Sequence, residues 1–167
     1  MAQIRVRHEM ECSEDTYWNK CVFNDEYNRK LYLEKLGFPR YNQIEMKDLG
    51  TSVTRKVDID PPVAGLPGPV KKVIGDKLSY LEEGTFDKAS KRYSFKVTPS
   101  TMADKTTVKG VLYTEALGEN RCARIVEVEI TVKVFMVGSL VEDKISGDLR
   151  SSYDAAAQFT NEFVKTH

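Results

Sequence analysis

The feature that most constrains the fold is the stretch VEVEITVKVF, residues 126–135, in which apolar and polar residues alternate. Side chains at alternate positions of a β-strand point to opposite faces of a sheet. The valine and isoleucine residues of this stretch therefore share one face, and the charged residues and Thr131 share the other. The pattern predicts a strand with one buried face. Either protein alone, or protein together with a small molecule, must cover that face.

The C-terminal segment, Val137 to His167, has a helical period instead. Its apolar residues recur at three- and four-residue spacing, so they form one stripe, with polar residues opposite. We expect an amphipathic helix of about 25 residues, or ~38 Å at the α-helical rise. A stripe of this length is best buried across the concave face of a curled sheet. The members of the stripe are Val141, Ile145, Leu149, Ser152, Ala156, Phe159 and Phe163, with Tyr153 at its edge.

The order of the other elements predicts an antiparallel sheet. The first residues, QIRVRHEMEC, alternate as a strand, and two short helices follow, one capped by Ser13 and one by Asn24 or Asp25, ending at Gly37. Hairpin turns are predicted at residues 50–51, 88–91 and 118–120. We therefore predict an α+β fold in which a curved antiparallel sheet of about six to seven strands wraps around the long helix. The chain, residues 1–167, is expected to form a single domain.

Charge and composition exclude several kinds of partner. Lys and Arg together number 25, as do Asp and Glu, and a balanced surface argues against nucleic-acid binding. The start lacks the apolar core of a signal peptide, and the three cysteines are scattered, so a cytoplasmic protein without a disulfide framework is expected. Neither metal-ligand spacing nor a phosphate-binding or dinucleotide motif is present, so we expect no metal and no cofactor. Membrane contact is expected to be transient at most, and the sequence does not indicate an oligomeric state.

Three stretches resemble a known superfamily. They are FNDEYNRKLYLEKLG, GDKLSYLEEGTF and VKVFMVGSLVEDKI, residues 23–37, 75–86 and 132–145. They are similar to the START-like superfamily, also called SRPBCC or Bet v 1-like, and more narrowly to a bacterial branch of unknown function. In the third stretch Val137, Gly138 and Glu142 match the pattern of that branch.

The resemblance covers nearly the whole chain and implies the helix-grip fold, with an elongated apolar cavity between the sheet and the long helix. Many members of the superfamily bind or carry lipids, sterols or other hydrophobic molecules. Others are cyclases, hydratases or aromatase-like enzymes, and some regulate chaperones or activate ATPases. Fold alone does not choose among these activities.

The strand and helix phases predict which residues would form the wall of such a cavity. Large rings with a few hydroxyls suit an apolar ligand site, although the same rings can simply fill a core. Gly110, Ser152 and the alanines at 155–157 favour open space, and a cavity of ~300–1,000 Å³ is typical of small-molecule sites. The predicted wall residues are Tyr80, Tyr93, Phe95, Leu112, Ile130, Leu149, Tyr153, Ala156 and Phe159.

Two polar residues share the inward phase. His8 alternates with the apolar residues of the first strand. It is either a polar anchor or proton-transfer group in the cavity, or a structural histidine bonded to a neighbour. Arg55 shares the phase of Val53 and Val57 and either meets a ligand head group or pairs with Glu82. The sequence leaves both alternatives open.

The segment from Pro61 to Gly75 is rich in proline and glycine and interrupts the strand pattern. Loops of this length often cover binding sites. We expect an ordinary packed loop, with a lid over the cavity as the alternative. Its apolar residues are Val63, Leu66, Val70 and Ile74.

The predicted function is binding or transfer of a hydrophobic small molecule, such as a lipid, a sterol or an isoprenoid-like compound. The alternative is a cyclase- or hydratase-type enzyme that acts on a polyketide- or steroid-like substrate. The chain has no Ser-His-Asp order and no Gly-x-Ser-x-Gly motif, so no catalytic residue is assigned. A protein-interaction module that uses the convex sheet face has the least support, since balanced charges leave no apolar patch there.

Overall fold

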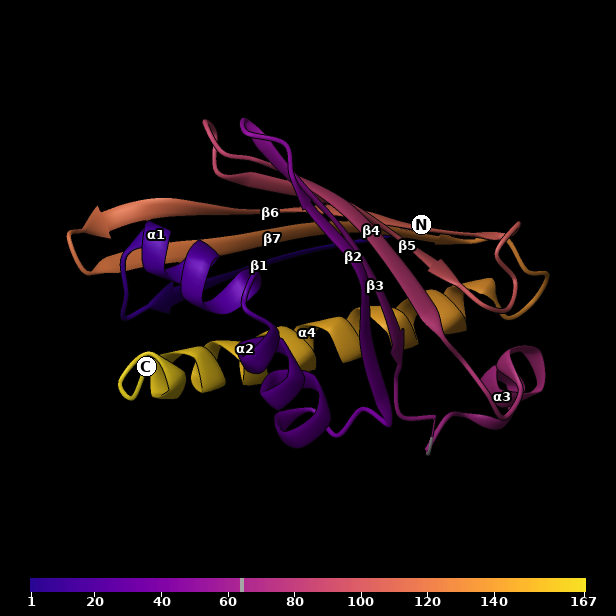
Figure 1. Ribbon diagram of the computed structural model, residues 1–167. Coiled ribbons are helices and arrows are strands. Elements are labelled where there is room, and N and C mark those ends of the chain that lie inside the picture. Colours follow the sequence, from indigo (N-terminus) through magenta and orange to yellow (C-terminus); the bar gives the residue numbers. More distant parts are fainter. Residues whose placement is uncertain (64) are drawn as a thin grey trace.

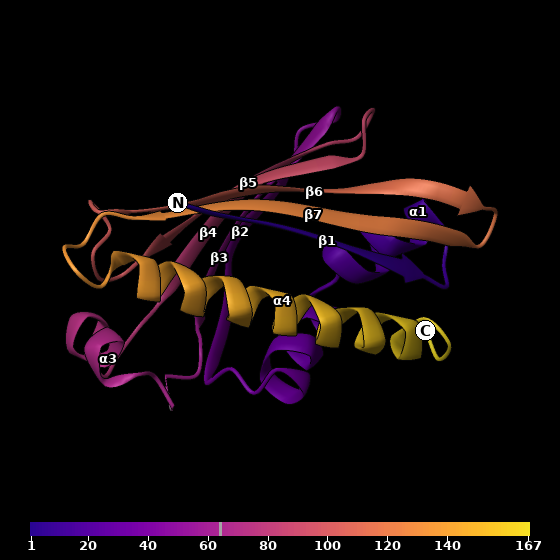
Figure 2. The ribbon, with the colours of Figure 1, turned by 180° about the vertical axis from the view of Figure 1, so that it is seen from behind.

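One antiparallel sheet of seven strands, with a long helix across its inner face, organises the computed structural model (Figures 1 and 2). The structure describes residues 1–63 and 65–167. The spatial order of the strands is β1-β7-β6-β5-β4-β3-β2, so the first strand pairs with the last and all other neighbouring strands are consecutive in the sequence. The strands are β1 Ala2–Met10, β2 Arg40–Asp48, β3 Ser52–Asp60, β4 Tyr80–Asp87, β5 Arg92–Pro99, β6 Thr106–Gly118 and β7 Arg121–Val132.

Helix α4, Gly138–Phe163, lies along the sheet and contacts β1 and β7 (Figure 2). Its apolar stripe faces the sheet, where Val141, Ala156 and Phe163 are buried. The inner positions of β7, which include Val126, Val128 and Ile130, are also buried. The predicted helix-grip architecture is therefore confirmed. In the described residues, no helix is long and apolar enough to cross a membrane.

The segment between β1 and β2 forms the two short helical units that the sequence predicts. The Ser13 hydroxyl accepts a hydrogen bond from the Thr16 amide at the start of α1, Glu14–Thr16. The Asn24 side chain accepts a hydrogen bond from the Tyr27 amide at the start of α2, Asp25–Arg29. Each unit then continues as a π-helical turn, η1 Tyr17–Val22 and η2 Lys30–Lys35. The apolar spacing did not predict these wider turns. Gly37, with φ of 69°, ends the segment.

Two glycines allow aromatic rings to lie directly on the sheet. Gly84, Phe95 and Gly110 are neighbours across β4, β5 and β6. A Cβ at position 84 would lie 2.1 Å from the Tyr93 ring, and one at position 110 would lie 2.7 Å from the Phe95 ring. The expectation that Gly110 leaves open space is therefore wrong, because Phe95 covers it. The rings instead pack where side chains are missing.

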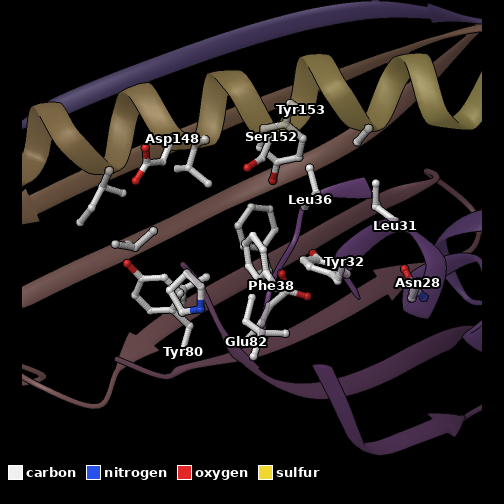
Figure 3. A pocket seen from close by; sticks show the side chains of 18 of the residues that line it. Asn28, Leu31, Tyr32, Leu36, Phe38, Tyr80, Glu82, Asp148, Ser152 and Tyr153 are labelled. Atoms are coloured by element: carbon white, nitrogen blue, oxygen red, sulfur yellow. The ribbon is translucent and has the colours of Figure 1, made fainter. Parts of the chain in front are cut away.

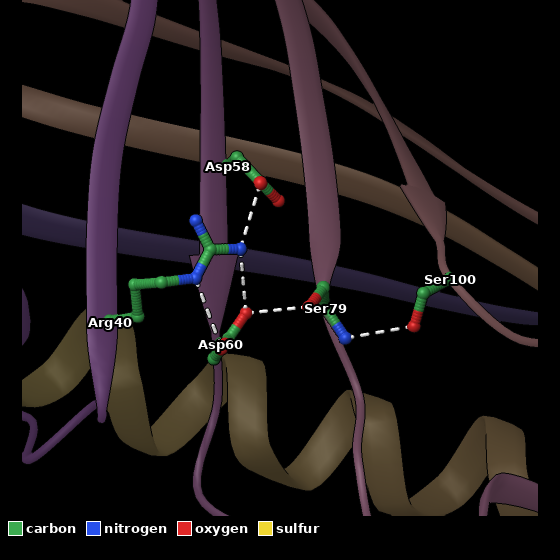
Figure 4. Close-up of polar contacts among 5 residues, drawn as sticks. All are labelled: Arg40, Asp58, Asp60, Ser79 and Ser100. Atoms are coloured by element: carbon green, nitrogen blue, oxygen red, sulfur yellow. Dashed lines mark hydrogen bonds and ion pairs between the residues drawn. The ribbon is translucent and has the colours of Figure 1, made fainter.

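A polar cluster fastens the ends of β2, β3 and β4 next to the proline-rich segment (Figure 4). The Arg40 guanidinium donates to both carboxylate oxygens of Asp60, at 3.1 and 2.9 Å, and to Asp58 at 2.7 Å. The Ser79 hydroxyl donates to Asp60 at 2.6 Å, and the Ser79 amide donates to the Ser100 hydroxyl at 2.9 Å. Asp60 is thus the centre of the cluster.

Asp60→Asn is expected to lower the free energy of unfolding by about 1 kcal/mol at neutral pH. The hydrogen bonds from Arg40 and Ser79 lower the pKa of Asp60. A carboxyl whose pKa is lower in the folded state stabilises the fold above its unfolded pKa of about 3.9, and this contribution is lost as pH falls through the folded value. Urea unfolding should therefore show the difference from wild type shrinking below about pH 4.

Asp76→Asn is the matched control, because the Asp76 side chain is 88% exposed and its ion pair with Lys71 is long, at 3.7 Å. It should have little effect at any pH. A difference between Asp60→Asn and wild type that stays constant from neutral to acidic pH would contradict the role given to this carboxylate.

Candidate functional site

An apolar cavity of about 200 Å³ lies between the sheet and α4 (Figure 3). Its walls come from the short helical units, from β3 to β7, from the proline-rich segment and from α4 between Ile145 and Ala156. The volume is below the expected range. Tyr32 and Phe38 reach into this region from η2 and the loop after it, and they pack on each other with ring centroids 5.3 Å apart. The sequence did not indicate that these rings would fill the space.

Most of the predicted wall residues lie at this cavity. They come from five different elements, so the tertiary structure brings together side chains that are far apart in the sequence. Their contacts with a ligand stay a prediction. The predicted residues in the lining are Arg55, Tyr80, Tyr93, Phe95, Leu112, Leu149, Tyr153 and Ala156.

Three predicted residues lie outside the lining, which corrects the predicted wall. Ile130 is fully buried in the core. Phe159 lies beyond the part of α4 that borders the cavity, and its ring packs on Tyr27 at 5.4 Å. His8 points to the inner face, but its ring nitrogens form hydrogen bonds with Arg124 on β7 and Asp154 on α4. Strand phase, or helix phase for Phe159, predicted the face of each residue but not its position along that face.

The proline-rich segment contributes to one end of the cavity. Val63, Leu66 and Ile74 line it, the last from helix α3, Gly68–Ile74. Val70 does not line it and is fully buried in the core. The fourth predicted lid residue is therefore a packing residue of α3. Movement of this segment as a lid stays a prediction.

Arg55 on β3 forms a buried ion pair, which decides between its two alternatives. Its Nη2 donates to Glu82 Oε2 at 3.1 Å and its Nη1 donates to the Val22 carbonyl at 2.6 Å. The hydroxyl of Tyr93 donates to the same Glu82 oxygen at 2.9 Å. Burial disfavours the charged guanidinium, but the neighbouring Tyr93 and Glu82 outweigh it and raise the pKa of Arg55. The pair is thus internally neutralised.

Tyrosine hydroxyls supply the other polar groups of the cavity. Burial raises the pKa of Tyr80 to about 12 and also raises the pKa values of Tyr93 and Tyr153. These hydroxyls stay protonated at physiological pH, so they can donate hydrogen bonds and are poor bases. An apolar wall with a few neutral donors suits binding of a largely apolar molecule.

Sequence reasoning missed Arg124, which lines the cavity and is 1% exposed. It lies opposite His8 in the register of β1 and β7. Its Nη2 donates to His8 Nδ1 at 2.7 Å and to the Tyr153 carbonyl at 2.9 Å. His8 therefore carries its proton on Nε2, which lies 2.7 Å from Asp154. The signal was in the sequence, because Arg124 precedes Val126 by two residues and so shares its inward phase.

Comparison with known proteins gives a family and a fold. A family model described as "Protein of unknown function (DUF2505)" matches residues 5–164. No curated protein matches the chain.

Several solved structures are similar over nearly the whole chain. The Zhui aromatase/cyclase from Streptomyces sp. R1128 has a TM-score of 0.71 at 10% identity, covering 99% of this chain and 96% of that one. Norcoclaurine synthase from Thalictrum flavum has a TM-score of 0.66 at 18% identity, with 99% and 87% covered. A START superfamily protein from Mycobacterium smegmatis has a TM-score of 0.64 at 13% identity, with 97% and 98% covered. At these identities the likeness shows the fold, which is the helix-grip fold of the START superfamily.

Proposed function

Since the chain belongs to the DUF2505 family of proteins of unknown function, we propose from its own cavity that it binds or carries a hydrophobic small molecule. The observation that carries the proposal is the apolar cavity of about 200 Å³ beneath α4. Burial of apolar ligand surface there contributes about 25 cal/mol per Å² removed from water. The cavity size favours a small member of the class of lipids and isoprenoid-like compounds.

The polar groups of the cavity support binding better than catalysis. The protonated tyrosine hydroxyls are donors that can orient a polar end of the ligand. Among the carboxylates of the lining, Glu82 is the best candidate for a general base, but it already accepts hydrogen bonds from Arg55 and Tyr93. Both donors contact its Oε2, so the protein itself already uses this oxygen.

A cyclase- or hydratase-type enzyme is the second candidate. Glu82 and Tyr93 lie together in the lining with a 2.9 Å hydrogen bond, and two structural neighbours are named as an aromatase/cyclase and a synthase. Turnover of a polyketide-like substrate that Glu82→Gln abolishes, with folding retained, would establish this alternative. His8→Ala is a weaker test, because His8 lies outside the lining.

A cavity-filling variant tests the binding proposal. Native mass spectrometry of the purified protein and a thermal-shift panel of lipids and isoprenoids should identify a ligand. Ser152 lines the cavity, whereas its neighbour Ser151 is exposed on the same helix. Ser152→Phe should weaken binding of that ligand by about tenfold or more, because the ring occupies its space.

Ser151→Phe is the matched control and should bind as wild type does. Equal binding by Ser152→Phe and wild type would place the ligand elsewhere. If neither method finds any ligand, the binding proposal is wrong.

A further inference from the structure

Two arginines line the cavity, but only one has a carboxylate partner. Arg55 pairs with Glu82 at 3.1 Å. Among the described residues, no carboxylate lies within ion-pairing distance of Arg124, although Arg124 is 1% exposed. An arginine stays protonated in proteins, and a buried charge without a counter-charge is costly. The cavity therefore has an uncompensated positive charge in its wall.

The hydrogen bonds of Arg124 do not use its whole guanidinium. Both of its hydrogen bonds come from Nη2, and its Nε is buried without a partner. The nearest carboxylate of the network belongs to Asp154, but the His8 ring lies between them. The Asp154 side chain is 69% exposed, so solvent screens its charge. His8 and Asp154 position the guanidinium without neutralising it.

The surroundings of Arg124 suit an acidic group. The Tyr153 ring lies under the guanidinium, 5.2 Å from its central carbon. Burial raises the pKa of Tyr17, although Arg124 counteracts it, so this lining hydroxyl is also a neutral donor. The carboxylates in the lining, Glu82 and Asp148, are held by Arg55 and Lys144 instead.

The cavity continues from Arg124 along α4 to Ile145. Tyr153, whose carbonyl binds Arg124, lies eight residues after Ile145, which corresponds to about 12 Å along the helix axis. This part of the lining includes Leu149 and, from the proline-rich segment, Val63 and Leu66. A charged head at Arg124 would thus have an apolar region in line with it.

We propose that the ligand is an organic anion, with a carboxylate bound to the guanidinium of Arg124 and an apolar body lying toward Ile145. The inference rests on the proposed binding function and names the chemical class of its ligand. The incoming carboxylate supplies the missing counter-charge and forms charge-assisted hydrogen bonds with the guanidinium. Arg124 is then the specificity-determining residue of the site, and His8 and Asp154 are positioning residues.

A matched pair of probes tests the proposal on the wild-type protein. Decanoate and decanol have the same chain and differ in the charged head. Isothermal titration at neutral pH should show decanoate binding tighter by about tenfold or more, because charge-assisted hydrogen bonds form only with the acid. Arg124→Gln should remove this preference, so that the variant binds the two probes with similar affinity. Arg124→Lys should keep part of it.

Arg121→Gln is the control, since Arg121 lies on the same strand but is exposed and pairs with Glu9. It should keep the full preference for decanoate. Equal affinities of wild type for the two probes would overturn the anion proposal while leaving the cavity proposal intact, as would a ligand panel in which only neutral compounds bind. If nothing in the panel binds, the proposed function itself fails. Should Arg124→Gln not fold, the wild-type probe pair and Arg124→Lys still decide the matter.

Discussion

Arg55→Met is expected to lower the free energy of unfolding by about 3–5 kcal/mol, the cost of breaking a buried ion pair by removing one partner. Glu82, whose side chain is 18% exposed, would lose its counter-charge and keep the hydrogen bond from the Tyr93 hydroxyl. The Val22 carbonyl would also lose its 2.6 Å hydrogen bond from Arg55. Chemical denaturation monitored by circular dichroism measures the loss.

A double-mutant cycle separates the charge effect from the loss of packing. Arg55→Met combined with Glu82→Leu removes both charges, and it should recover much of the stability, because an apolar pair needs no desolvation of ions. Arg40→Met, which breaks a half-exposed pair on the same sheet, should cost about 1 kcal/mol or less. If the double variant is no more stable than Arg55→Met, the uncompensated Glu82 charge is not the cause.

Trp18→Ala is expected to lower the free energy of unfolding by about 3–5 kcal/mol, as is usual when a large buried ring is truncated. Trp18 is 2% exposed, and its ring stacks on that of Phe86 at 4.3 Å. Its indole N–H donates to the Thr114 hydroxyl at 2.9 Å, which joins η1 to β6. The variant therefore loses a hydrogen bond and a ring contact between the first helical unit and the sheet. Thermal or urea unfolding measures the cost.

Trp18→Phe is the corresponding conservative variant. It keeps most of the aromatic packing and loses the hydrogen bond, so a smaller cost of about 1–2 kcal/mol is expected. The neighbouring Tyr17 lines the cavity, so Trp18→Ala should also weaken ligand binding, whereas Trp18→Phe should not. A Trp18→Ala variant as stable as wild type would show that the first helical unit is held by other contacts.

Local sequence signals predicted the elements well, because they depend on residues close together in the chain. Ser13 and Asn24 cap their helices through side-chain oxygens that only need the next few amides. The hairpin turn near Gly50 requires a positive φ, and that residue has φ of 94°. The strict alternation after Val126 determined which face of β7 is buried. The family resemblance then supplied the way in which helix and sheet combine.

The contents of the site were less predictable. The inward phase of His8 was predicted, but its partner was not, because Arg124 becomes its neighbour only when β1 pairs with β7. The small volume of the cavity results from the rings of Tyr32 and Phe38. These rings come from a segment whose residue spacing does not predict where it packs. Phe159 belongs to the predicted stripe, yet it lies beyond the part of α4 that borders the cavity.

The sequence by itself determined the strands, the helices, their caps and the buried face of each, because period and turn chemistry act within a few residues. Only the tertiary structure decided which inward residues contact each other. Arg55 forms an ion pair with Glu82, whereas Arg124 donates a hydrogen bond to His8 and, among the described residues, has no carboxylate partner. The physical reason is that charges interact through space across strands that are distant in the chain. Whether a buried charge is neutralised therefore depends on the pairing of strands and the docking of helices.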